Sequence, residues 1–108
     1  MKAATDAFLG DVHAGRYADA YAKTGAGYRG SVALPRFTAG VKANAYLRGA
    51  RSFGALKSHV SQGAGQIEGT LQSDVGPVSG VISFSFVDGA WWIVGVALAG
   101  APALPGPA

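Results

Sequence analysis

Few side chains in this sequence could do chemistry, and their spacing does not bring them together. Cysteine is absent, which excludes disulfides, thiolate metal sites and cysteine nucleophiles. The two histidines, His13 and His59, share no helical or strand spacing with further metal ligands. His13 suits the end of a predicted helix, and His59 lies on an outward strand face. We therefore expect no metal site and no cofactor.

Proton-transfer catalysis would need a carboxylate enclosed in a pocket, where burial shifts its pKa. The pattern places the carboxylates elsewhere: Asp6, Asp11 and Asp19 on outward helix positions, Glu68 on the wet face of a strand, Asp74 in a loop and Asp88 in a turn. The sequence thus predicts no catalytic residue. An enzyme that uses Tyr21 or Tyr28 with one of these carboxylates is the alternative.

Aromatic residues are the best candidates for a binding site. Tyr17 and Tyr21 are four residues apart on one predicted helix, so they share a face. With other aromatic residues they could edge a small apolar pocket and offer hydroxyl groups to a ligand. The predicted ligand-binding residues are Phe8, Tyr17, Tyr21, Tyr28, Phe37 and Trp91. Ordinary core packing is the other interpretation of the same residues.

The second half of the chain predicts the scaffold for these side chains. The apolar runs Val78–Val87 and Ala90–Leu98 are joined by Asp88-Gly89, a dipeptide that favours a two-residue hairpin turn. Residues 66–73 alternate between apolar and polar, and residues 52–60 form a first, irregular strand with Leu56, Ser58 and Val60 on one face. Gly63–Gly65 is the predicted turn between them. The expected inner face carries Ile67, Leu71, Ile82, Phe84, Phe86 and Ile93.

The first half predicts helices over residues 3–14, about 17–24, and from Leu34-Pro35 through Ala45, with residues 25–31 as a loop. Helices followed by four antiparallel strands define an α+β fold whose helices cover the inner sheet face. We expect residues 1–100 to form a single domain and residues 101–108, which contain three prolines, to form a tail.

Composition and charge limit the classes of partner that we expect this chain to bind. Hydrophobic residues make up 49% of the 108 residues and charged residues 14%, which is typical of a folded domain. Residues 1–57 carry nine basic and three acidic residues, a net charge of +6, whereas residues 58–108 carry −3. Because Arg36 and Lys42 lie on nearly opposite sides of a predicted helix, we expect no nucleic-acid binding. Binding of the N-terminal half to an anionic surface is the weakest alternative.

The outer face of the predicted sheet carries a candidate interface. If Trp91 and Ile93 face the helices, strand alternation places other apolar side chains outward. The predicted interface residues are Val81, Val87, Trp92 and Val94. An apolar patch on a serine-rich face indicates a homodimer through this face. The alternatives are a different protein partner, or a bulge near Gly95 that turns Trp92 inward.

Two motifs carry a resemblance to a known family. The segment Gly15-Arg16-Tyr17-Ala18-Asp19-Ala20-Tyr21 and the strand Gly89-Ala90-Trp91-Trp92-Ile93 resemble the nuclear transport factor 2-like superfamily, and in particular its small bacterial domains of unknown function. The resemblance covers residues 3–100. It implies a cone-like (cystatin-like) fold, homodimers through the sheet, and a cavity that ketosteroid isomerase, scytalone dehydratase and limonene epoxide hydrolase use for catalysis.

The expected function is a non-enzymatic binding or interaction domain, homodimeric and with a small apolar cavity for an apolar ligand. The alternative is a small-molecule isomerase, dehydratase or hydrolase of the ketosteroid-isomerase type. No apolar stretch reaches the ~18 residues of a membrane span, and the first residues do not show the basic and apolar pattern expected of a leader. Because such domains are often secreted or membrane-anchored, the resemblance implies an extracytoplasmic bacterial location, which the composition itself does not indicate.

Overall fold

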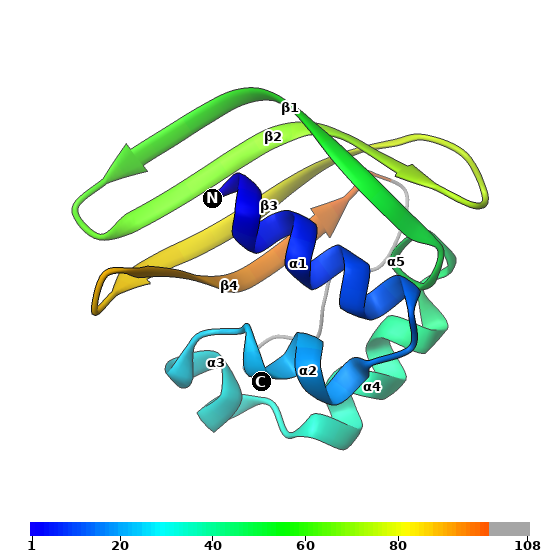
Figure 1. Ribbon diagram of the computed structural model, residues 1–108, viewed down its shortest axis with the longest axis horizontal. Helices are drawn as coiled ribbons and strands as arrows, with labels where there is room; N and C mark the ends of the chain where they lie inside the picture. Colours follow the sequence, from blue (N-terminus) through cyan, green and yellow to red (C-terminus); the bar gives the residue numbers. More distant parts are fainter. Residues whose placement is uncertain (100–108) are drawn as a thin grey trace.

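A computed structural model describes residues 1–99, in which helices precede a four-stranded antiparallel sheet (Figure 1). The predicted α+β class is confirmed, while the predicted tail, 101–108, lies outside the described residues. The helices are α1 (Lys2–His13), α2 (Tyr17–Ala22), α3 (Ala26–Ser31), α4 (Leu34–Ala43) and α5 (Ala45–Arg48). The strands are β1 (Ala50–Ser61), β2 (Ala64–Ser73), β3 (Val78–Val87) and β4 (Ala90–Leu98).

Helix α1 lies across the sheet and supplies most of the helical side of the core (Figure 1). Phe8, Leu9 and Val12 follow helical spacing and are buried. The Thr5 hydroxyl donates to the Met1 carbonyl at 2.9 Å, which satisfies a polar group inside the first turn. The helix predicted over residues 3–14 is confirmed, with bounds one residue earlier at each end.

The remaining helices form a layer beside α1. Pro35 lies in the first turn of α4, where its missing N–H costs no hydrogen bond. The Asn44 side chain caps α5 by accepting hydrogen bonds from the backbone N–H groups of Tyr46 and Leu47, at 3.1 and 3.2 Å. Both helices therefore begin at residues suited to a helix start.

The predicted loop over residues 25–31 is wrong, because residues 26–31 form α3. Its glycines disfavour a helix by local propensity. Tertiary contacts override that propensity: the Gly25 N–H donates to the Ile93 carbonyl at 2.9 Å, and Tyr28 is buried. The residue that precedes the short helix is thus held by the edge of β4.

The sheet has the order β1-β2-β3-β4, so each strand pairs with its neighbour in sequence. The β3–β4 turn is the predicted one: Asp88 and Gly89 have φ angles of 52° and 79°, the left-handed values of a type I′ turn. The first hairpin differs from the prediction, because its turn is Gln62-Gly63, with φ angles of 48° and 78°, and β2 already begins at Ala64.

The inner sheet face meets the helices as predicted. Its buried side chains include the predicted Ile67, Leu71, Ile82, Phe84 and Ile93. Phe86 shares this face but remains 43% exposed. It lies near the end of β3, where the Trp91 ring packs against it with centroids 4.8 Å apart. The helical layer therefore does not cover this end of the sheet.

Two β-bulges change which side chains face inward. In β1 the pairing shifts between Ala55 and Lys57, so the predicted common face of Leu56, Ser58 and Val60 is wrong. Leu56 is 82% exposed, and Phe53 is the buried side chain instead. Bulges insert an unpaired residue and so break the alternation of a strand.

The second bulge lies in β4. Phe84 pairs with Ile93, whereas Ser83 pairs with Gly95, which leaves Val94 as the extra residue. Both Ile93 and Val96 are consequently buried. A bulge near Gly95 was one predicted alternative, but Trp92 still pairs with Ser85 on the outer face.

Gly69 is required where β1 bends across β2. It pairs with Ala55, and a Cβ atom at this position would lie 2.0 Å from the Gly54 carbonyl oxygen. We predict that Gly69→Ala lowers the free energy of unfolding, measured by chemical denaturation, by at least about 2 kcal/mol. The reason is that the backbone at Gly54 must move away from the added methyl group.

The matched control is Gly10→Ala, at a solvent-exposed site in α1 where an added Cβ meets no atom within 4 Å. This change should raise stability by about 0.5–1 kcal/mol, since alanine favours the helix interior. Equal effects of the two substitutions would contradict the close approach of β1 to Gly69.

Candidate functional site

Four of the six predicted ligand-binding residues pack directly against one another. The Phe37 ring contacts Phe8, Tyr21 and Tyr28, with centroids 6.2, 5.4 and 6.4 Å apart. Phe8 and Phe37 are fully buried. The Tyr21 hydroxyl donates to the Val32 carbonyl at 2.5 Å. These contacts are those of a packed aromatic core, and burial raises the pKa of Tyr28.

The other two predicted residues lie elsewhere. Tyr17 lies beneath the Lys42 ammonium group, 5.5 Å from the ring centroid. Trp91 lies on the inner face near the far end of the sheet, against Phe84 and Phe86. It also covers Gly65, where a Cβ would be 2.8 Å from the indole. The six aromatic residues therefore do not surround one shared cavity.

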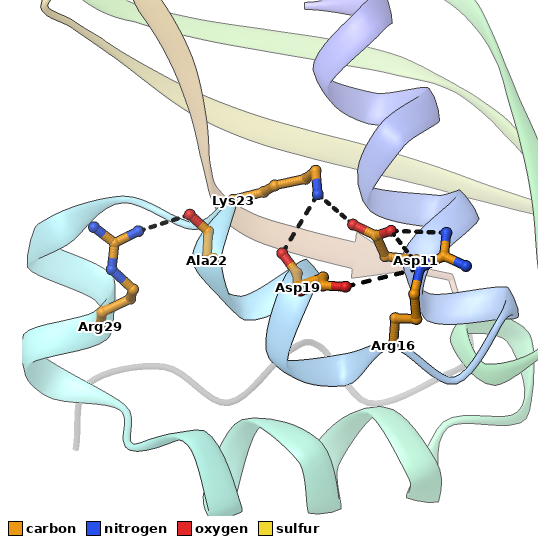
Figure 2. A network of polar contacts seen from close by, with 6 residues as sticks. All are labelled: Asp11, Arg16, Asp19, Ala22, Lys23 and Arg29. Carbon is orange, nitrogen blue, oxygen red and sulfur yellow. Dashed lines mark hydrogen bonds and ion pairs between the residues drawn. The ribbon is translucent and has the colours of Figure 1, made fainter.

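Asp11 was predicted to face outward, and this is wrong. Its carboxylate is buried between α1 and α2, where Arg16 donates to Oδ1 from Nε and Nη2 at 3.2 and 3.0 Å. Lys23 donates to Oδ2, and Arg16 also lies 3.8 Å from the Asp19 carboxylate (Figure 2). The network ties α1 to α2. One sequence signal was available: Asp11 lies three residues after the buried Phe8, on the same side of the helix.

Two opposing effects set the charge state of Asp11. Burial raises the pKa of the carboxyl group, but the hydrogen bonds and charges of Lys23 and Arg16 lower it by more, so the pKa lies below its usual value. The group is therefore ionised and paired at neutral pH. A carboxylate in this state suits structural linkage better than proton transfer.

A second cluster joins three elements around Asp74. Arg51 in β1 donates to Oδ1, and Nε2 of His13, at the end of α1, lies 3.3 Å from Oδ2. The Asp74 backbone N–H donates to the Gly49 carbonyl at 2.9 Å. The hydrogen bond from Arg51 is the largest influence on the Asp74 pKa, which lies below its usual value. Among residues 1–99 no three potential metal-ligating side chains gather at one site.

The outer face of the sheet is the remaining candidate site. A polar hollow of about 320 Å³ is lined there by Lys57, Ser58, His59, Gln66 and Glu68, and two further open grooves are mainly apolar. One groove, of about 510 Å³, crosses all four strands; its wall includes Leu56, Lys57, Glu68, Val81 and Ala97. The other, of about 350 Å³, lies toward the opposite end of the same face; its wall includes His59, Ala64, Gln66, Ser83 and Val94. Apolar and small polar side chains therefore alternate across an accessible surface.

The predicted interface residues are all on this face. Val81 lines the first groove and Val94 the second, while Val87 is half-exposed near the end of β3. Trp92 donates from its indole N–H to the Val87 carbonyl at 3.3 Å. The Arg29 guanidinium lies over the Trp92 ring, 5.6 Å from its centroid.

The sequence did not predict that Leu56 and Arg29 belong to the outer face, because their positions depend on tertiary structure. Leu56 lines the first groove only because the β1 bulge removes it from the predicted strand face. Arg29 reaches Trp92 only because the segment before α3 pairs with β4, through the bridge between Thr24 and Ile93. Neither pairing leaves a signal in residue spacing.

Comparison with known proteins adds no assignment. No protein-family model matches the chain, and no curated protein matches its sequence. The resemblance to the nuclear transport factor 2-like superfamily stays a prediction. Within residues 1–99, none of the helices combines the length and the apolar character that crossing a membrane requires.

Asp11→Asn tests the network between α1 and α2. We expect the free energy of unfolding to fall by about 1–3 kcal/mol at pH 7, because the charged hydrogen bonds to Arg16 and Lys23 are lost. Because the pKa of Asp11 is lower in the folded state, its carboxylate contributes its full stabilisation at any pH above the unfolded-state pKa. This stabilisation is lost as the pH falls through the folded-state pKa, which lies below 3.8.

Denaturation of both proteins between pH 7 and pH 2 would measure this difference. Asp6→Asn is the control, since Asp6 forms only an exposed pair with Lys2 and should cost less than about 1 kcal/mol. A stability difference for Asp11→Asn that does not shrink toward low pH would contradict the assigned charge state.

Proposed function

We propose that this chain is a non-catalytic interaction domain of the cone-shaped, nuclear transport factor 2-like type, which binds a second copy of itself through the outer face of its sheet. The observation that carries the proposal is the pair of open, largely apolar grooves on that face. Contiguous apolar surface that remains accessible in a folded domain is typical of a protein-binding site.

The side chains of this face suit sheet-on-sheet packing. Val81 and Val94 project from β3 and β4. Ser83 and its partner Gly95 are small, as is Ser85, whereas the partner of Ser85 is the large Trp92. Small residues let two sheets approach to the usual separation of about 10 Å while the larger residues interdigitate.

The size of the face supports a second copy as the occupant. Strands of about ten residues span roughly 30 Å, and four of them span roughly 20 Å. The resulting area of roughly 600 Å² per copy approaches the ~800 Å² of a standard protein interface. The face also carries both a cationic residue, Lys57, and an anionic residue, Glu68, so two copies need not repel each other.

A catalytic role has less support from the described residues. Asp11 is paired with Arg16 and Lys23, and Asp74 is paired with Arg51 and His13. Glu68 lies on an open groove. The aromatic core around Phe37 is packed, so we do not place a ligand between its rings.

Sedimentation velocity over a range of concentrations tests the proposal. The unmodified protein should sediment as a dimer, and Val94→Asp should raise the dimer dissociation constant at least about tenfold, since a carboxylate replaces an apolar contact. Val75→Asp is the control, because Val75 is also exposed to solvent, at 57% against 37% for Val94, but lies in the β2–β3 connection. A monomer at every concentration, or equal effects of the two variants, would refute the proposal.

A further inference from the structure

Within the proposed dimer, on which this inference rests, we infer that Arg29 of each copy forms an ion pair with Glu68 of the other copy. The two copies are then related by a two-fold axis that lies between the two sheets and passes over Ser83. Three features lead to this arrangement of the two copies. The oriented guanidinium of Arg29 lies at one corner of the outer face, the carboxylate of Glu68 lies diagonally opposite and has no ion-pair partner among residues 1–99, and Ser83 lies midway between them.

Arg29 is held in place by groups that leave its charge uncompensated. Its Nη1 donates to the Ala22 carbonyl at 3.0 Å (Figure 2), and it also donates to the Thr24 carbonyl. The guanidinium also lies over the Trp92 ring on the outer face. Among residues 1–99 no carboxylate lies within ion-pair distance of Arg29. Arginine and tryptophan are the residues that most often dominate interface energetics, and an arginine already oriented loses little entropy on binding.

Glu68 is the matching anion. It projects from β2 onto the same face and is exposed. Its register partners are Lys57 in β1 and Val81 in β3. Lys57 and Glu68 are neighbours across the strands, but in the described part of the chain neither belongs to an ion pair within 4.0 Å. Glu68 therefore keeps its acceptor atoms available to a partner.

Strand register places these two groups symmetrically. Glu68 lies beside Val81, whereas Trp92 lies beside Ser85, four residues further along β3 and about 13 Å away. β2 and β4 flank β3 at about 4.8 Å on either side. The midpoint of the line from Glu68 to Trp92 is therefore Ser83.

A two-fold axis over Ser83, perpendicular to that line, exchanges the two corners, so Glu68 of one copy meets Arg29 and Trp92 of the other. The same rotation brings Val81 against Val94 of the other copy, which joins the two grooves into one apolar contact. The strands of the two sheets then cross steeply, close to the orthogonal class of sheet packing. An isologous interface of this kind is closed and forms dimers only.

Charge reversal tests the pairing. Arg29→Glu and Glu68→Arg should each raise the homodimer dissociation constant at least about tenfold, because like charges then face each other. An equimolar mixture of the two variants should form heterodimers with an affinity near that of the unmodified protein, since both pairs regain opposite charges. Native mass spectrometry resolves the three species by mass.

Matched controls are Arg36→Glu, on an exposed position of α4, and Asp6→Arg, on an exposed position of α1. Both should leave the dimer unchanged. If the unmodified protein dimerises but the charge-reversed variants also form homodimers, without preference for the mixed species, the pairing is wrong and the outer-face proposal stands. If the unmodified protein is monomeric, both fail.

Ser83→Cys provides a test that does not depend on the fold tolerating Arg29→Glu. Because the natural chain has no cysteine, a short bifunctional maleimide can link only the introduced thiols. Two residues on the axis face each other, so Ser83→Cys should cross-link into dimers with high yield, and Ala39→Cys, exposed on α4, should not. Equal yields at the two positions would overturn the proposed axis.

Discussion

The burial of the inner sheet face beneath α1 is the constraint on which the rest of the molecule depends. Phe8, Leu9 and Val12 are almost inaccessible to water and belong to one core cluster with Ile82 and Ile93. Burial of each such side chain stabilises the fold by roughly 1.5–3 kcal/mol. Because strand side chains alternate, committing one face to this core commits the other face to solvent or to a partner. The outer face is thus a consequence of the core.

Polar contacts orient the helices that the core attracts. Hydrophobic contacts hold α1 on the sheet without specifying the direction of α2, whereas the buried Asp11 carboxylate accepts hydrogen bonds from Arg16 and Lys23 only in one arrangement. Asp74 connects the same, C-terminal end of α1 to the sheet in a similar manner, through His13. Charged residues of the N-terminal half are therefore partly engaged in holding helices in place, which reduces the basic surface left for an anionic partner.

Irregularities in the strands create the features of the outer face on which the proposed interface depends. The β1 bulge exposes Leu56, and the β4 bulge adds Val94 to the outward side chains without removing Ile93 from the core. The main-chain bridge from Thr24 to Ile93 then closes part of the β4 edge and brings Arg29 over Trp92. A regular sheet of the same composition would present a flatter and more polar surface.

The sequence by itself determined the α+β class, the four strands, the I′ turn at Asp88-Gly89 and the inward side chains of β3, because turn chemistry and side-chain periodicity are local properties. Only the tertiary structure decided the burial of Asp11, the helix at residues 26–31, the two bulges and the packing of the predicted pocket aromatics around Phe37. Those features arise from contacts between residues distant in the chain, and a buried aromatic cluster and a ligand pocket require the same residue types at the same spacing.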